Sequence, residues 1–130
     1  MTPDELRALP LFSGLSDACL ERLAARAGEL ECGAGQVLAL PGDPGSGMYV
    51  VLEGQVSVEM RGGWHTELGL GSYFGEVALL VPGATRVARV RAATDVRCLS
   101  IPREDALALI ESEPSLALAM LRELARRLAG

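Results

Sequence analysis

Several residue types are scarce or absent in this sequence, and each gap narrows what the chain can be. The 130 residues contain no lysine, so all 12 basic residues are arginine, and with 17 acidic residues the net charge is −5. Such a charge disfavours a nucleic-acid surface and leaves no polybasic patch for a membrane. No apolar run approaches a membrane span, and the N-terminus lacks the pattern of a signal peptide. We therefore expect no membrane contact.

Cysteine and histidine are equally sparse. Cys19, Cys32 and Cys98 form no CxxC pair, so the sequence indicates neither a disulfide framework nor a zinc site, and the cytosol is the simplest compartment. The single histidine, His65, lies beside a Gly-Gly turn without a second metal ligand at a suitable spacing. We expect an exposed turn residue and no metal site. The same lack of clustered ligands argues against a metal-dependent cupin enzyme.

Catalytic and stacking residues are also hard to find. No nucleophile, base and orienting group recur at a recognisable spacing, and Ser72, close to Glu76, is interpreted as a turn hydroxyl. The expectation is a protein that is not an enzyme. Trp64, Tyr49 and Tyr73 are too scattered to predict a stacking platform for single-stranded nucleic acid, so we expect them in the core or at its rim.

Helical signals begin the chain. Thr2-Pro3-Asp4-Glu5 has the pattern of a capping box with proline at the first helical position, which predicts a short helix to about Leu9. A second helix is predicted to begin at Ser16 and to end at Gly28. Helices are therefore expected over about residues 3–28.

Helical signals also end the chain. Two helices are expected over about residues 102–129, the second opening at Pro114 and running to Leu128. An apolar stripe is predicted along that second helix, formed by Ala117, Leu121, Leu124 and Leu128 with Leu116 and Met120 beside it. Glu123 and Arg127 are expected to pair on the polar side. The width of the stripe makes this helix a candidate homodimer surface.

Between the helical ends, about residues 30–101 alternate short apolar strands with glycine-rich turns, which is typical of an antiparallel sandwich or barrel. Residues 48–52 are predicted to pair with residues 55–60 across Glu53-Gly54. In a later strand we expect one inward set and one outward set: Ala88, Val90 and Ala92 inward, Arg89 and Arg91 outward. The length suits one domain over residues 1–130.

One stretch has the pattern of an anion-binding cradle. Gly75 lets the backbone approach a ligand, and residues 76–80 can form a short helix whose free N–H groups point at it. Arg86 can place a bidentate fork on phosphate, while the Glu76 carboxylate accepts a hydroxyl proton. A ligand with a phosphate next to a sugar hydroxyl would suit both side chains.

The same residues carry a family resemblance. Phe74-Gly75-Glu76 with Ala78-Leu79, followed by Arg-Val-Ala-Arg-Val-Arg-Ala from Arg86, resembles the phosphate-binding cassette of cyclic nucleotide-binding domains. The offset of 12 residues from Phe74 to Arg86 resembles the bacterial catabolite activator branch, whose loop is one residue longer than in kinase regulatory subunits. The resemblance implies a mainly β fold, an antiparallel double-stranded β-helix (jelly roll) flanked by N-terminal and C-terminal α-helices.

The resemblance also implies a function. It implies a regulatory module that senses cAMP or cGMP and signals through movement of its C-terminal helices. The ligand-binding residues implied are Phe74, Gly75, Glu76, Val77, Ala78, Arg86, Val87 and Ala88. Glu76 would hold the ribose 2′-hydroxyl and Arg86 the cyclic phosphate. Val87 occupies a position where the family has Ser or Thr, and losing that hydroxyl contact should cost about 1–2 kcal/mol, or about tenfold in affinity.

Alternatives stay open at this point. Glu76 and Arg86 could form only a structural salt bridge, and Val87 favours a degenerate structural or oligomerisation domain of the same fold. The pocket could also sense another small anion. Arg89 is expected to face solvent.

The output partner of the module is unknown. In the transcription factors that the chain resembles, a helix-turn-helix follows this domain, but nothing after Gly130 could supply one. We therefore expect no DNA binding by this chain. It would act through an unidentified effector protein or domain, either as a free-standing module or as part of a longer protein.

Overall fold

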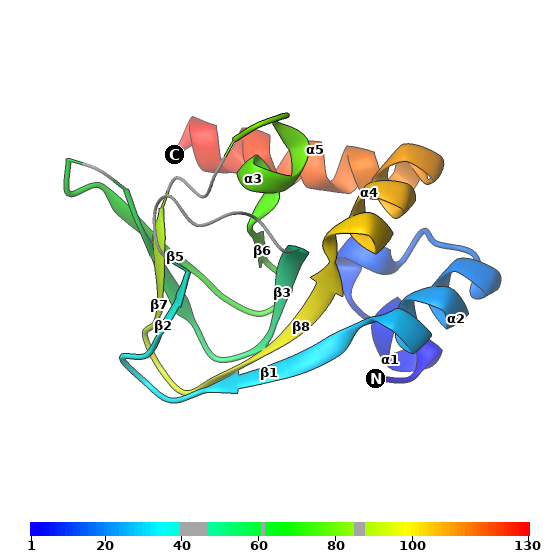
Figure 1. The fold of residues 1–130 in the computed structure, drawn as a ribbon, viewed down its shortest axis with the longest axis horizontal. Helices are drawn as coiled ribbons and strands as arrows, with labels where there is room; N and C mark the ends of the chain where they lie inside the picture. Colours follow the sequence, from blue (N-terminus) through cyan, green and yellow to red (C-terminus); the bar gives the residue numbers. More distant parts are fainter. Residues whose placement is uncertain (40–46, 61, 85–87) are drawn as a thin grey trace.

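Most helices gather at one end of the molecule and the strands at the other, and the C-terminal helix extends above the strands (Figure 1). The structure, a computed structural model, describes residues 1–39, 47–60, 62–84 and 88–130. The helices are α1 (Pro3–Arg7), the 3-10 helix η1 (Pro10–Phe12), α2 (Asp17–Arg26), α3 (Glu76–Leu80), α4 (Arg103–Ser112) and α5 (Pro114–Ala129). The strands are β1 (Gly28–Cys32), β2 (Val37–Ala39), β3 (Gly47–Glu53), β4 (Val56–Glu59), β5 (His65–Leu68), β6 (Tyr73–Phe74), β7 (Arg89–Ala92) and β8 (Val96–Pro102).

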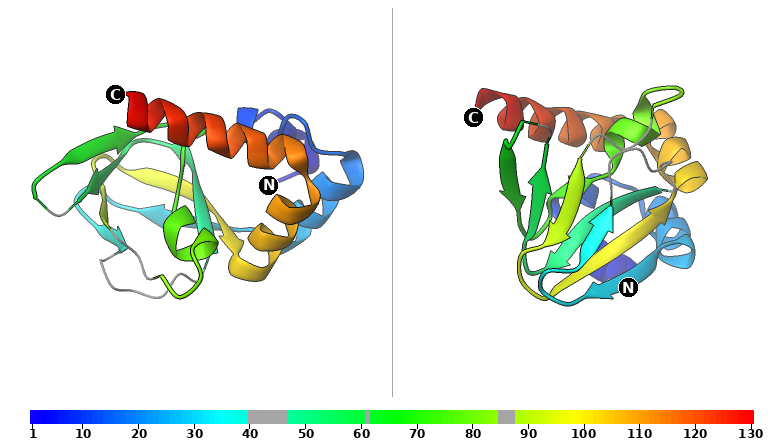
Figure 2. Two further views of the ribbon diagram at one scale, coloured as in Figure 1. Left: turned by 90° about the horizontal axis from the view of Figure 1, so that it is seen from above. Right: turned by 60° about the vertical axis from the view of Figure 1, so that its left-hand side comes forward.

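The described strands form two four-stranded antiparallel sheets, ordered β1-β8-β3-β6 and β2-β7-β4-β5. Helices α1, α2 and α4 pack at one end, and α5 runs back across the top of the roll (Figure 2). The jelly roll with flanking helices that the sequence predicts is therefore confirmed.

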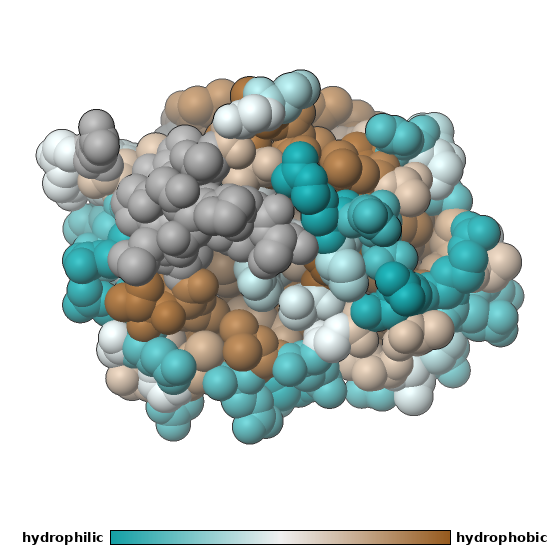
Figure 3. Space-filling view, in the orientation of Figure 1, coloured by the Kyte–Doolittle hydropathy of each residue, from teal (hydrophilic) through white to brown (hydrophobic). Residues whose placement is uncertain are grey.

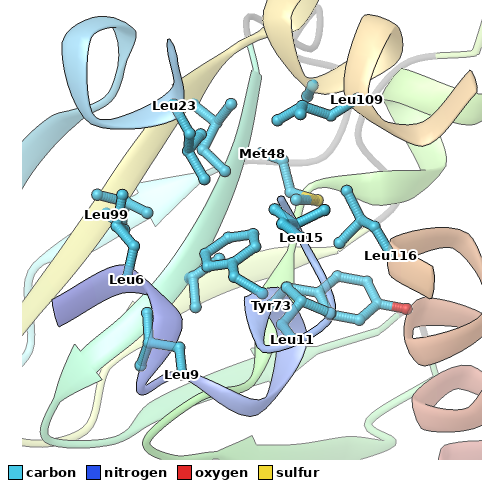
Figure 4. Packing of buried hydrophobic residues seen from close by; sticks show 14 of the residues in the cluster. Leu6, Leu9, Leu11, Leu15, Leu23, Met48, Tyr73, Leu99, Leu109 and Leu116 are labelled. Atoms are coloured by element: carbon cyan, nitrogen blue, oxygen red, sulfur yellow. The ribbon is translucent and has the colours of Figure 1, made fainter. Parts of the chain in front are cut away.

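Strand β3 separates two hydrophobic cores. Met48, Val50 and Leu52 pack with the helices, whereas Val51 points between the sheets. Successive side chains of a strand point to opposite faces, so a strand buried on both faces reads as a continuous apolar run. Strand β6 is divided in the same way: Tyr73 belongs to the helical core (Figure 4) and Phe74 to the core between the sheets.

The predicted hairpin between residues 48–52 and 55–60 is wrong. Strand β3 pairs with β8 and β6, and β4 pairs with β5 and β7 in the other sheet. Gly54, with φ of 82°, turns the chain from one sheet to the other, and a Cβ there would lie 2.2 Å from the Asp95 carbonyl oxygen. Gln55 N–H donates to Thr94 Oγ1 at 3.0 Å. The crossing is thus held by the β7–β8 turn rather than by a hairpin.

The capping box of α1 is confirmed, since Glu5 N–H donates to Thr2 Oγ1 at 3.2 Å and Thr2 N–H to Glu5 Oε1 at 3.1 Å. Helix α2 begins after Ser16, as predicted, but the role assigned to Gly28 is wrong. Residue 27 caps the helix with an extended backbone, and Gly28 is the first residue of β1.

Helix α5 spans nearly the predicted residues but turns a different face inward. Leu116 and Met120 are buried, while Leu121 and Leu128 of the predicted stripe are 63% and 90% exposed. Glu123 and Arg127 pair as predicted, yet on the packed side, with side chains 18% and 20% exposed. Spacings of four, three and four residues place positions 116, 120, 123 and 127 on one helix face. That face packs inward, and the pairing of the two charges lowers the cost of removing them from water.

The surface shown in Figure 3 is a mosaic in which hydrophobic residues lie in separate groups between hydrophilic ones. Cys19, Cys32 and Cys98 are free and buried. None of the helices in the described ranges is long and apolar enough to cross a membrane.

Candidate functional site

A cavity of about 320 Å³ lies among the β2-β7-β4-β5 sheet, α3 and the last turns of α5. Its lining residues come from the β4–β5 hairpin, the start of α3, β7 and α5. They are Val58, Met60, Trp64, Thr66, Leu68, Phe74, Gly75, Glu76, Val77, Ala78, Ala88, Val90, Leu124, Arg127 and Leu128. The volume falls at the lower end of the range for small-molecule sites, about 300–1,000 Å³.

The structure brings the predicted site residues that it describes to this one cavity. They are Phe74, Gly75, Glu76, Val77, Ala78 and Ala88. Arg86 and Val87 lie outside the described residues. Ala88, Val90 and Ala92 are buried, as the sequence predicts for the inward set. Ligand binding by these residues stays a prediction.

Gly75 gives the start of α3 its shape. Its φ of 94° is in the left-handed region, which side chains other than glycine rarely adopt, and α3 has no side-chain cap. The first amides of the helix are therefore not engaged by a capping side chain. Beside it, the Phe74 ring stacks on Tyr49 with a centroid distance of 5.1 Å and an angle of 17°. Gly75 makes the sharp turn, and the two preceding residues, Tyr73 and Phe74 of β6, are fixed by packing.

Glu76 is the acidic side chain of the cavity lining, and its partner in the structure comes from α5. Arg127 Nη1 lies 3.6 Å from Glu76 Oε1, and the two side chains are 20% and 13% exposed. In so little water an unpaired charge would be costly, so the two opposite charges compensate each other. The pair ties α3 to the C-terminal helix directly at the cavity.

Arg127 is held by further groups. Its guanidinium also bonds the Glu123 carboxylate and the Tyr73 carbonyl oxygen, and its Cζ lies 4.7 Å from the centroid of the Tyr73 ring. Arginine suits such a place because it offers five donors and a flat face that stacks on aromatic rings. One side chain of α5 thus contacts α3, β6 and its own helix.

Tyr73 is the second anchor of α5. Its side chain is fully buried, and its hydroxyl donates to the Met120 carbonyl oxygen at 2.7 Å. Figure 4 shows the hydroxyl pointing at α5. Burial raises the pKa of the Tyr73 phenol far above its ordinary value of 10.0. The neutral phenol is therefore the form that the folded protein stabilises.

Arg103, the first residue of α4, contacts the other end of α3. Its Nη1 donates to the Ala78 carbonyl oxygen at 2.7 Å and its Nη2 to that of Leu79 at 3.4 Å. A cation at a helix C-terminus satisfies carbonyl groups that lack a helical partner and complements the helix dipole. Helix α3 is thus connected to α4 at its end and to α5 near its start.

The arginines of β7 are not part of the cavity lining. Arg89 Nη2 donates to Glu59 Oε2 at 2.7 Å, and Arg91 Nε lies 3.5 Å from Glu59 Oε1. The Arg89 hydrogen bond lowers the pKa of the Glu59 carboxyl. Both arginines face outward as predicted, but Arg89 is in an ion pair rather than simply in solvent. His65 is exposed, at the start of β5 rather than in a turn.

Sequence reasoning missed the contribution of α5 to the cavity, which comes from Leu124, Arg127 and Leu128. A signal was present: Glu123 and Arg127 continue the spacing of Leu116 and Met120. The prediction that Glu123 and Arg127 lie on the solvent side of the helix concealed this pattern. The contribution of the hairpin residues Met60, Trp64 and Thr66 to the cavity was also missed. They line the same cavity as the start of α3 only because of how the chain folds, which their local sequence does not show.

The chain belongs to the cyclic nucleotide-binding domain family, whose model matches residues 29–113. The matched segment includes both sheets, α3 and all the predicted site residues. In the described ranges, no group of three or more His, Cys, Asp or Glu side chains is placed to hold a metal ion.

Curated relatives include much longer proteins. A cyclic nucleotide-gated potassium channel of Mesorhizobium japonicum is 40% identical over 110 residues, which cover 85% of this chain and 30% of the channel. An uncharacterised NTE family protein of Mycobacterium tuberculosis is 35% identical over 124 residues, covering 95% of this chain and 21% of that protein. The chain therefore spans less than a third of the length of these relatives.

Solved structures of similar fold include the catabolite activator protein of Thermus thermophilus, with 34% identity and a TM-score of 0.73 over 92% of this chain and 58% of that one. A cAMP-binding acyltransferase of Mycobacterium smegmatis has 32% identity and a TM-score of 0.82, covering 98% and 41%. The regulatory subunit of a cAMP-independent protein kinase A of Trypanosoma brucei has 26% identity and a TM-score of 0.78, covering 94% and 45%.

The buried phenol predicts how stability depends on pH. Because the folded-state pKa of Tyr73 is raised, its contribution is complete below the unfolded value near 10.0 and is lost as pH rises above it. In urea unfolding, Tyr73→Phe should cost about 1 kcal/mol at pH 7 through the lost hydrogen bond. Above pH 10, the deficit of Tyr73→Phe relative to the wild type should shrink. A constant deficit from pH 7 to 11 would contradict this assignment.

Proposed function

We propose that residues 1–130 form one regulatory module that binds a cyclic nucleotide, cAMP or cGMP, and has no catalytic activity of its own. The observation that carries the proposal is the cavity in which Glu76, the start of α3 and Ala88 come together. Membership of the cyclic nucleotide-binding domain family points to the same ligand class. A largely buried carboxylate beside backbone amides suits a ligand that has both hydroxyl and anionic groups.

In this proposal the ribose 2′-hydroxyl donates to Glu76 beside Arg127. The cyclic phosphate lies at the amides that begin α3, where the helix dipole favours an anion. Arg86 supplies the counter-charge and Val87 a weaker contact than a hydroxyl would give. Phe74, Gly75, Val77, Ala78 and Ala88 shape the walls.

The signal leaves through the C-terminal helices. A ligand that moves α3 also moves its two contacts, Arg103 in α4 and Arg127 in α5. Whatever those helices bind must then change ligand affinity in return, because coupling between two sites is reciprocal.

The outer side of α5 is a candidate surface for a homodimer or for an effector. Leu118 and Leu121 are 46% and 63% exposed and lie on one side of the helix. We expect no DNA binding by these residues, since the net charge is −5. The free cysteines favour the cytosol as the compartment.

A second candidate function keeps the fold and changes the ligand. A protein of this fold belongs to a kinase described as cAMP-independent, and Val87 occupies the position of a family phosphate contact. The cavity would then hold another small anion or serve only a structural or oligomerisation role. The two candidates differ in whether a cyclic nucleotide binds at all.

Calorimetric titration with cAMP and with cGMP tests the proposal. We expect a 1:1 binding heat with at least one of them. Because hydrogen bonds to charged groups contribute about 1.5–3 kcal/mol, Glu76→Ala should weaken binding by about 10- to 100-fold, and Arg86→Ala by as much or more.

The exposed residue Leu70 does not line the cavity, so Leu70→Ala serves as the control and should leave the affinity unchanged. No heat with either nucleotide on folded protein would refute the proposal in favour of the second candidate. Binding that is insensitive to Arg86→Ala would refute only the role of Arg86.

The Arg103 contact gives a separate prediction about the signal. Hydrogen exchange of the α5 amides should change when saturating cyclic nucleotide is added, and Arg103→Ala should reduce that change to about half or less, because hydrogen bonds that connect α4 to α3 are lost. Arg26→Ala is the matched control, because Arg26 pairs with Asp105 of α4 at 3.1 Å without contacting α3. An equal exchange response in wild type and Arg103→Ala would contradict this route.

A further inference from the structure

Trp64 is the one tryptophan of the chain, and it is 56% exposed. It lies on the β4–β5 hairpin, which is closed by the Met60 N–H donating to the Trp64 carbonyl oxygen at 2.8 Å. A tryptophan side chain carries a large apolar surface, so leaving more than half of it in water forgoes a substantial gain from burial. The position calls for an explanation beyond packing of the folded chain.

Trp64 is one of the residues that line the cavity. Its lining neighbours include Met60 on the same hairpin and Leu128 at the end of α5, which is 90% exposed. Met60 directly follows β4, and Leu128 lies in the last turn of α5. Figure 2 shows the β4–β5 hairpin and the C-terminal end of α5 at the same end of the molecule. The rim of the cavity is therefore apolar and open.

The cavity walls differ in chemistry. The wall made by the start of α3 and by α5 carries the charges of Glu76 and Arg127, whereas the wall made by the hairpin is almost entirely apolar. In the described part of that hairpin wall, the Thr66 hydroxyl and the Trp64 indole N–H are the polar side-chain groups, among Val58, Met60 and Leu68. A matching ligand needs a polar end and a flat or apolar end.

We propose that the purine base of a bound cyclic nucleotide stacks on the indole of Trp64, a position that rests on the proposed function above. The sugar and phosphate take the charged wall, and the base extends along the hairpin to the rim. An indole face suits a heteroaromatic ring better than an aliphatic group, because both rings expose large polarisable faces. The exposed surface of Trp64 is then covered by the ligand rather than by other residues of the protein.

The chain's single tryptophan makes the test direct, since its fluorescence reports on residue 64 alone. Titration of the full chain with cAMP and cGMP should change the Trp64 emission, with the same midpoint as the binding heat. A ligand that binds elsewhere in the cavity would give the heat without the change in emission.

Substitutions separate stacking from simple apolar contact. Trp64→Ala should weaken nucleotide binding by about 5- to 150-fold, the range for loss of one aromatic–base stack. Trp64→Phe keeps an aromatic face, so its nucleotide affinity should be lower than that of the wild type by at most about tenfold. Trp64→Leu keeps apolar bulk without a ring and should resemble Trp64→Ala. Since residue 64 is half exposed, all three variants should unfold in urea at nearly the wild-type midpoint.

The outcomes distinguish the two levels of the account. Nucleotide binding with unchanged emission, or with wild-type affinity in Trp64→Ala, overturns the stacking role and leaves the proposed function intact. Wild-type affinity in Trp64→Leu overturns stacking in favour of a plain apolar contact. No nucleotide binding by the folded wild type overturns the proposed function and the stacking role together.

Discussion

The docking of α5 depends on the guanidinium of Arg127. Removing an arginine from water is unfavourable unless its donors find acceptors. The Nη groups of Arg127 find them on Glu123, on the Tyr73 carbonyl and near Glu76, whereas its buried Nε has no hydrogen-bond partner among the described residues. These acceptors lie on α5, β6 and α3, so one side chain fixes three elements relative to each other. A shift of α5 by one turn would leave these charges half buried and unpaired. The helix is therefore held in one register over the cavity.

Strand β6 turns this constraint into a connection between the cavity and the helices. Tyr73 points into the helical core and bonds the Met120 carbonyl oxygen, while the next residue, Phe74, lines the cavity and stacks on Tyr49. Because Tyr73 and Phe74 are adjacent residues, one short strand contributes both to the packing of α5 and to the cavity lining. Arg103 binds the far end of α3, so both α4 and α5 contact the short helix that lines the cavity.

Features set by neighbouring residues could be predicted from the sequence. The capping box of Thr2 and Glu5, the helix opening at Pro114 and the grouping of Phe74 to Ala78 depend on contacts within a few residues. The jelly roll followed from the family resemblance rather than from strand pairing. The predicted pairing of residues 48–52 with 55–60 failed because Gly54 allows a crossing between sheets whose partner, Asp95, is distant in sequence.

The prediction of which face of α5 points inward failed for a related reason. Hydrophobic patterning assigns leucines to the core, but Arg127 is buried at the expense of Leu121 and Leu128, since its acceptors come from β6 and α3. Its role is visible only when the partners are placed by the fold. The roles of Arg86 and Val87 stay predictions.

A double-mutant cycle tests the central claim, that Glu76 and Arg127 act as one unit on which both ligand and helix depend. The measurement is the dissociation constant for the bound cyclic nucleotide in wild type, Glu76→Gln, Arg127→Gln and the double variant. The account predicts that the double variant loses little more affinity than the weaker-binding single variant, with a coupling of about 1–2 kcal/mol. Losses that simply add, with no coupling between residues 76 and 127, would contradict it.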